Sequence, residues 1–152
     1  MSKYLFINGS ANRNGRTARM AAELLKGHEY ETLDLVDMRV AQYGQSIEGD
    51  QFMDVIDAMR QADVVVMGSP VYWHTMGGLL KTVLDRLYEL YGTDPGLGGK
   101  QLALIFQGAA PTKLSVENTV YIFERVAEVL GMEFAGSATN EAELKSLRAK
   151  LK

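Results

Sequence analysis

Short apolar runs of strand type alternate with amphipathic helical stretches along the whole chain. The clearest run is residues 62–68 (ADVVVMG), which is almost entirely apolar or β-branched, as in a strand covered on both faces. Further strands are predicted at residues 3–8, 30–35, 100–107 and 132–137, and helices at residues 16–25, 52–61, 75–91, 115–130 and 141–151. This alternation predicts one α/β domain over residues 1–152.

Five strand–helix units favour an open, five-stranded parallel sheet of order 2-1-3-4-5 with helices on both faces. In this arrangement ligands bind beyond the carboxyl ends of strands 1 and 3. The segments to inspect are therefore the first loop (residues 8–17), the second loop (residues 68–78) and the third loop (residues 107–112), which follow strands 1, 3 and 4.

Composition excludes several classes of function. Sixteen Lys and Arg against 19 Asp and Glu give a net charge of −3, which argues against a nucleic-acid binder. The chain has no cysteine, so a disulfide, a thiolate nucleophile, a Cys-ligated zinc and an iron–sulfur cluster are excluded, and its two histidines predict no metal site. The longest apolar run, residues 102–106, is far below the roughly 20 residues of a membrane span, and no secretion signal opens the chain. We expect a cytoplasmic protein.

The first loop has the composition of a phosphate site at the start of a helix. A helix start offers unpaired N–H groups and a partial positive charge. Short polar side chains and two arginines add donors: Ser10, Asn12, Asn14, Thr17, Arg13 and Arg16. The alternative is an ordinary turn and cap. The loop lacks the spacing of a nucleoside-triphosphate loop or a dinucleotide loop, and the acidic residues of a phospho-receiver domain are absent.

The second loop places the only tryptophan, Trp73, between Tyr72 and His74, at the end of the predicted buried strand. Aromatic side chains there can line a flat ring system, with about 1 kcal/mol per favourable stacking contact. The alternative is that Tyr72 and Trp73 fill the space between sheet and helix, with His74 at the surface start of that helix. The third loop is small and polar, and it either hydrogen-bonds the edge of a ligand or forms a simple turn.

Two motifs resemble one family. Asn8-Gly9-Ser10 with Asn14-Gly15-Arg16-Thr17 is similar to the G-S-P-R-x-x-G-N-T loop of the flavodoxin-like NAD(P)H-dependent FMN reductases and quinone reductases. The run from Ala62-Asp63 through Gly68-Ser69-Pro70-Val71-Tyr72-Trp73, then Leu80-Lys81 and Leu84-Asp85-Arg86, is similar to that family's second motif. The resemblance covers about the first 110 residues.

This chain departs from the family pattern at three places. Asn12 stands where a basic residue is common, and Arg16 where a small amide is common. Tyr43, Gly44 and Ser46 occupy the region where iron–sulfur relatives carry cysteines, so a cluster-bearing flavoprotein is excluded. The loop also differs from the T-x-T-G-N-T loop of flavodoxins, which disfavours a pure electron carrier.

The resemblance implies a flavodoxin-like fold that binds FMN. The phosphate would be held by the first loop, through Ser10, Asn12, Asn14, Gly15, Arg16 and Thr17. The second loop would border the isoalloxazine with Pro70, Val71, Tyr72 and Trp73 along it and His74, Thr75 and Met76 near its edge. The third loop would close the other side with Gln107, Gly108 and Ala109. No dedicated catalytic residue is expected; His74, Tyr72 or water would supply a proton.

The implied reaction is hydride transfer from NADH or NADPH through flavin N5 to a quinone, a flavin or a similar flat acceptor. The resemblance also implies a homodimer or homotetramer, for which the predicted helix at residues 75–91, with Tyr88 and Tyr91, offers a contact surface. Two alternatives are a flavodoxin-type, non-catalytic electron carrier and a binding module that has lost the cofactor. Which nicotinamide and which acceptor are used stays open.

Overall fold

The computed structural model describes all 152 residues, and its elements alternate between strand and helix. The strands are β1 (Tyr4–Asn8), β2 (Tyr30–Asp34), β3 (Val64–Tyr72), β4 (Thr75–Met76), β5 (Gln101–Gln107) and β6 (Glu133–Ala138). The α-helices are α1 (Arg16–Leu24), α2 (Phe52–Gln61), α3 (Gly78–Arg86), α4 (Lys113–Leu130) and α5 (Glu141–Arg148). Two short 3₁₀ helices, η1 (Leu35–Asp37) and η2 (Leu87–Leu90), complete the set.

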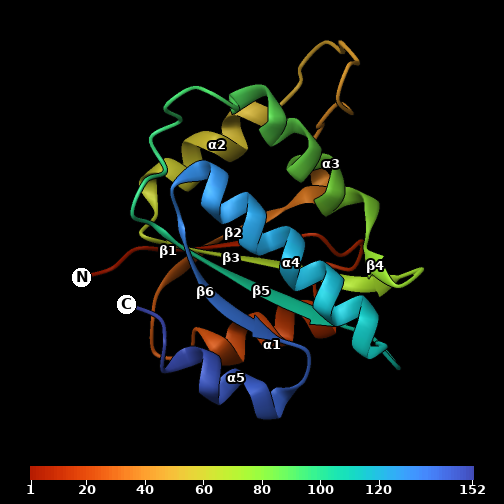
Figure 1. The fold of residues 1–152 in the computed structure, drawn as a ribbon, viewed down its shortest axis with the longest axis vertical. Helices are drawn as coiled ribbons and strands as arrows, with labels where there is room; N and C mark the ends of the chain where they lie inside the picture. Colours follow the sequence, from red (N-terminus) through yellow and green to blue (C-terminus); the bar gives the residue numbers. More distant parts are fainter.

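Five parallel strands lie in the order β2-β1-β3-β5-β6, and β4 pairs antiparallel with the end of β3 outside this path. Counted over the parallel strands, this is the predicted order 2-1-3-4-5. Helices α1 and α5 cover one face, and α2, α3 and α4 cover the other (Figure 1). The predicted flavodoxin-like α/β architecture is confirmed.

The sheet separates two apolar cores because neighbouring residues of a strand point to opposite faces. In β1, Leu5 and Ile7 join the larger core beneath α2, α3 and α4, whereas Tyr4 and Phe6 join the smaller core beneath α1 and α5. The whole of β5 is buried, which explains its continuous apolar run. Each core extends along its own face of the sheet, and together they pack both faces of the strands.

The prediction of a helix over residues 75–91 was wrong at its start. Thr75 and Met76 are extended and pair with Tyr72 and Val71, so β3 runs four residues beyond the predicted strand and turns back on itself. The helix begins only at Gly78 and continues as η2 after Arg86. The apolar stripe of the helix was read correctly, but the turn before it carries no glycine or asparagine that would have revealed a hairpin.

A buried arginine fastens the long connection between β2 and α2 to helix α3. Arg86 donates through Nη1 to the Ala41 carbonyl at 2.8 Å and through Nη2 to Asp50 Oδ2 at 2.7 Å. Its guanidinium also lies 4.5 Å from the ring centre of Phe52, and Glu89 accepts from Nε at 2.5 Å. These contacts hold residues 38–51 against the helical layer without regular secondary structure.

None of the helices combines the length and the hydrophobicity that a bilayer crossing requires.

Candidate functional site

The first loop is wound by a chain of hydrogen bonds from short side chains. Asn8, buried at the end of β1, donates to Asp34 Oδ1 at 2.9 Å and accepts from the Ser10 amide at 3.1 Å. The Ser10 hydroxyl accepts from the Asn12 amide, and the Asn12 side chain accepts from the Asn14 amide, each at 3.1 Å. Each side chain thereby bonds the backbone two residues on, which turns the strand end into the start of α1.

Helix α1 starts without a side-chain cap. Its N-cap residue is Gly15, and no side chain accepts a hydrogen bond from the first turn. Amide groups at such a helix start need an acceptor, and the helix dipole favours an anion there. The N-cap residues of α2 and α3 likewise make no side-chain cap, whereas Thr112 and Asn140 cap α4 and α5 with their side chains. The donor set of the first loop therefore fits a phosphate group.

Both arginines of the first loop already have a carboxylate partner. Arg13 forms a two-pronged ion pair with Asp37 of η1, with Nε donating to Oδ2 at 2.6 Å. Arg16 contacts Glu141 of α5 at 3.3 Å. These pairs hold the pKa of Asp37 and of Glu141 below the ordinary carboxyl value, chiefly through the arginine hydrogen bond. Both carboxylates are therefore ionised at neutral pH.

The three loops meet at one edge of the sheet. The Gly9 amide donates to the Gly68 carbonyl at 2.7 Å, which joins the first loop to β3. Gln107 Nε2 donates to Thr17 Oγ1 at 2.9 Å, which joins the end of β5 to α1. Thr17 packs so closely over Gly68 that a Cβ at position 68 would lie 2.6 Å from its methyl carbon. The predicted meeting of the loops is thus present in the structure.

The second loop is a tight hairpin with the aromatic residues at its tip. Trp73 and His74 connect β3 to β4 with φ values of 49° and 65°, the left-handed region that two-residue hairpins of type I′ require. Asparagine and glycine are usual there, so two bulkier residues store backbone strain. The Ser69 hydroxyl accepts from the Gly77 amide at 2.8 Å and fixes the base of the hairpin.

The side chains at the tip differ in their exposure. Trp73 is 95% exposed and Tyr72 52% exposed, whereas Met76 is only 3% exposed and belongs to the larger core. Tyr72 lies against the Gly77 backbone instead of filling the space beneath α3. The tip therefore exposes aromatic surface, whereas the Met76 side chain is buried away from it.

The third loop packs against the second. Pro70 and Gln107 are register partners, and a Cβ on Gly108 would lie 3.0 Å from Val71 Cβ. Gln107 is 9% exposed, while Ala109 is exposed. Of the predicted phosphate residues, Ser10 and Thr17 are buried, and Asn12 and Asn14 are exposed. Thr17 serves as the contact between α1, β3 and β5.

Three carboxylates of this edge were not predicted: Asp34, Asp37 and Glu141. Asp34 and Asp37 follow β2, the neighbour of β1, so the predicted strand order could have placed them beside the first loop. Glu141 begins α5, far from Arg16 in the sequence, and only the packing of α1 beside α5 brings the two together. No local pattern in the sequence signals that contact.

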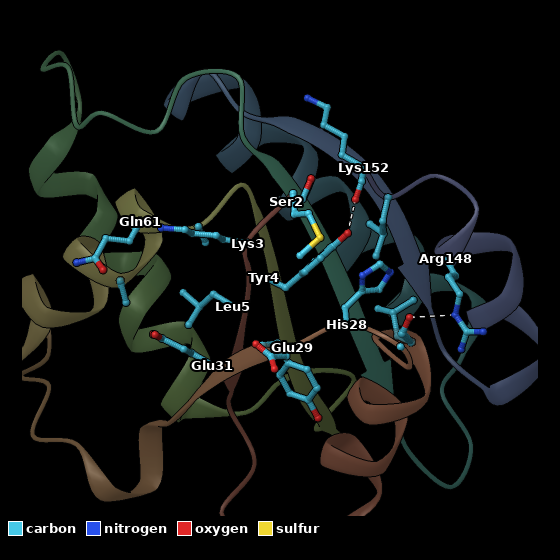
Figure 2. Close-up of a pocket in the computed structure, with 17 residues that line it drawn as sticks. Ser2, Lys3, Tyr4, Leu5, His28, Glu29, Glu31, Gln61, Arg148 and Lys152 are labelled. Carbon is cyan, nitrogen blue, oxygen red and sulfur yellow. Dashed lines mark hydrogen bonds between the residues drawn. The ribbon is translucent and has the colours of Figure 1, made fainter.

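A broad depression of about 1300 Å³ lies at the opposite edge of the sheet, where the chain ends meet (Figure 2). The rings of Tyr4 and His28 lie there 4.6 Å apart, and the Tyr4 hydroxyl donates to the Lys152 carbonyl. Figure 2 shows Lys3, Glu29 and Arg148 around the same hollow. None of the residues singled out from the sequence lines it, so it is separate from the candidate site.

The candidate site carries no metal-binding group: the structure brings no three His, Asp or Glu side chains together in a suitable arrangement.

Comparison with known proteins gives a family match. The sequence profile of the family described as NADPH-dependent FMN reductase matches residues 2–141. YwqN of Bacillus subtilis (strain 168), a proposed NAD(P)H-dependent, FMN-containing oxidoreductase, is 27% identical to this chain. The alignment covers 91% of this chain and 84% of YwqN. An iron–sulfur flavoprotein of Archaeoglobus fulgidus is 31% identical in an alignment that covers 55% of this chain and 48% of the flavoprotein.

Among solved structures, the Trp repressor binding protein of Bacillus subtilis has a TM-score of 0.75 at 23% identity, with 98% of this chain and 99% of that chain covered. This likeness supports the fold.

Proposed function

The chain belongs to the NADPH-dependent FMN reductase family, and from that membership we propose which residues hold the flavin and what the protein reduces. It is an FMN-dependent NAD(P)H oxidoreductase. When bound, FMN would supply the chemistry of hydride transfer between a nicotinamide and an electron acceptor. The alternatives of a carrier and of a module without cofactor are therefore set aside.

We propose that the first loop binds the FMN phosphate. The supporting observation is the uncapped start of α1, where the first-turn amides have no side-chain acceptor. Ser10 and the exposed residues Asn12 and Asn14 form the hydrogen-bonded turn that leads into this helix start. The remaining members of the proposed phosphate set are Gly15, Arg16 and Thr17. A dianion at this position needs no lysine, because backbone amides and the helix dipole stabilise it.

The isoalloxazine would lie over the edge where the second and third loops meet. Pro70 and Val71 would border it along β3, Tyr72 and Trp73 would flank it from the hairpin, and Gln107, Gly108 and Ala109 would face it from the other side. His74, Thr75 and Met76 would lie near its edge, Met76 through its backbone. The strain at Trp73 and His74 supports this proposal, because strained backbone is common where side chains are held for a ligand.

No side chain is proposed as a nucleophile or as one half of an acid–base pair. His74 is exposed, and Tyr72 is half-exposed beside it, so either can exchange a proton with water. The residues of the site would orient two flat molecules, and a site that stacks flat rings would take acceptors such as quinones, free flavins, azo dyes and nitroaromatics. We place the reaction in the cytoplasm, where reduced nicotinamides are available, and propose a homodimer or homotetramer in which Tyr88 and Tyr91 contribute to the contact.

One experiment tests this function. Purified protein is titrated with FMN while its visible spectrum is recorded, and NADH or NADPH is then added without oxygen. We expect a bound-flavin spectrum that bleaches with at least one nicotinamide, and bleaching that reverses when a quinone is added. Protein that takes up no FMN would overturn the proposal, and FMN binding without bleaching would overturn the assignment of the donor.

A further inference from the structure

Arg16 is held loosely between two segments of the candidate site. Its Nε and Nη2 donate to the two carboxylate oxygens of Glu141 at 3.4 and 3.3 Å, and Nη1 donates to the Gly108 carbonyl at 3.5 Å. Charge-assisted hydrogen bonds of arginine are usually about 2.7–2.9 Å long. All three contacts are longer, so the guanidinium can leave them at little cost.

Arg13 differs in this respect. It forms short hydrogen bonds to both oxygens of Asp37, which draws its guanidinium toward η1. Arg16 is therefore the arginine of the first loop that a new anion can recruit more easily. In the unliganded protein its charge is matched by Glu141.

Glu141 is not the capping residue of helix α5. The Asn140 side chain caps the helix by accepting from the Glu143 amide at 3.0 Å, and Glu143 in return accepts from the Thr139 amide at 2.9 Å. Glu141 is exposed, and Arg16 is the side chain that contacts its carboxylate. A substitution that removes only its charge leaves both caps in place.

We infer that Glu141 sets the affinity of the first loop for the FMN phosphate by competing with that phosphate for the Arg16 guanidinium. The inference rests on the proposed function, which puts the phosphate at the start of α1. A bound phosphate can contact the Arg16 guanidinium only when the guanidinium leaves the Glu141 carboxylate or contacts both groups at once. Because the Glu141 side chain is 64% exposed and that of Arg16 is 37% exposed, water screens the pair, and the competition changes the dissociation constant by about two- to fivefold.

The test uses Glu141→Gln with FMN and riboflavin as paired probes, since the two differ only in the phosphate. Titrations by fluorescence quenching should show FMN binding about two- to fivefold tighter than in the wild type, with riboflavin unchanged. The gain should shrink as salt is raised from low concentration to 0.5 M, because salt screens exposed charges. Glu29→Gln, which removes the same charge at the opposite edge of the sheet, should leave both dissociation constants unchanged.

A double-mutant cycle tests whether Glu141 acts through Arg16. Arg16→Met should weaken FMN binding and leave riboflavin binding alone, and adding Glu141→Gln to it should bring no further change. Circular dichroism checks that each variant is folded. Unchanged or weaker FMN binding by Glu141→Gln, or an equal gain in the Arg16→Met background, would overturn the inference alone. A wild type that binds neither probe would overturn the proposed function and this inference with it.

Discussion

At the scale of single residues, the hairpin tip combines an unfavourable backbone with an exposed aromatic ring. Trp73 and His74 both have positive φ, a region that costs residues with a Cβ about 1–2 kcal/mol each. Trp73 makes little compensating contact, because its side chain is almost fully exposed. Packing of the Trp73 ring within this chain therefore does not offset the backbone strain.

We expect the double substitution Trp73→Asn with His74→Gly to stabilise the protein by about 1–2 kcal/mol, since Asn-Gly suits this turn. The same change should weaken FMN binding several-fold by removing an aromatic contact worth about 1 kcal/mol. Chemical denaturation and FMN titration measure the two effects. Trp73→Ala is the matched control, because it removes the ring and keeps the backbone strain. Equal stability of the double variant and the wild type would contradict a strained turn.

Substitution by alanine should have opposite effects on stability at two glycines near the site. A Cβ at Gly9 would lie 2.7 Å from the Gly68 carbonyl oxygen and 2.8 Å from Leu80 Cβ, so Gly9→Ala should cost about 1–3 kcal/mol. A Cβ at Gly78 meets nothing within 4 Å, and Gly78→Ala should be neutral or stabilise by about 0.5 kcal/mol. Urea unfolding of the two variants compares them. A Gly9→Ala variant as stable as Gly78→Ala and the wild type would mean that β1 and α3 can move to make room for the added Cβ.

At the scale of elements, the sequence predicted strands and helices best where burial is complete. The apolar centres of β3 and β5 were read correctly, because residues buried on both faces of a sheet are mostly apolar, although β3 spans Val64–Tyr72 rather than residues 62–68. The β3–β4 hairpin was missed because only two residues of each strand pair and because its turn has no glycine. The attachment of residues 38–51 to α3 through Arg86 was not visible in the local sequence pattern.

That attachment predicts a dependence of stability on pH. Hydrogen bonding from Arg86 holds the pKa of Asp50 below its ordinary value, 3.8. Since the folded pKa is lowered, Asp50 contributes stability above about pH 4, and this contribution is lost as the pH falls through the folded pKa. Asp50→Asn should therefore lower the free energy of unfolding at pH 7 by about 1 kcal/mol and reduce its acid sensitivity below pH 4.

The measurement is thermal or urea unfolding between pH 3 and pH 7. Asp57→Asn is the matched control, because Asp57 pairs with Arg60 at 2.8 Å on the surface, where an ion pair contributes little. A control as destabilised as Asp50→Asn would show that the buried position of Arg86 is unimportant.

At the scale of the whole molecule, the strand order could be predicted from the alternation of elements, and with it the edge where the loops meet. The side-chain contacts across that edge could not. Arg16 and Glu141 are 125 residues apart in the chain, and Arg13 and Asp37 are 24 apart. Such pairs depend on which helix lies beside which, a property of packing rather than of local sequence. The phosphate and ring residues remain predictions.

A ligand that binds three loops from different parts of the chain should stabilise the entire fold. Free FMN at one hundred times its dissociation constant should raise the free energy of unfolding by about 2.7 kcal/mol. Thermal melting followed by circular dichroism measures the shift. Inorganic phosphate at the same concentration serves as the control and should give a smaller shift, because it cannot contact the second and third loops. An equal shift with phosphate would mean that the hairpin takes no part in binding.

The buried link between Thr17 and Gln107 also constrains how this sequence can drift. Replacing Thr17 by valine would leave the buried side-chain amide of Gln107 without its hydrogen-bond acceptor. This loss should lower the free energy of unfolding by about 1–3 kcal/mol. Exchanging both for apolar residues of matching shape would remove that penalty. Across an alignment of homologues, the two positions should consequently mutate in concert, as a coevolving pair spanning ninety residues.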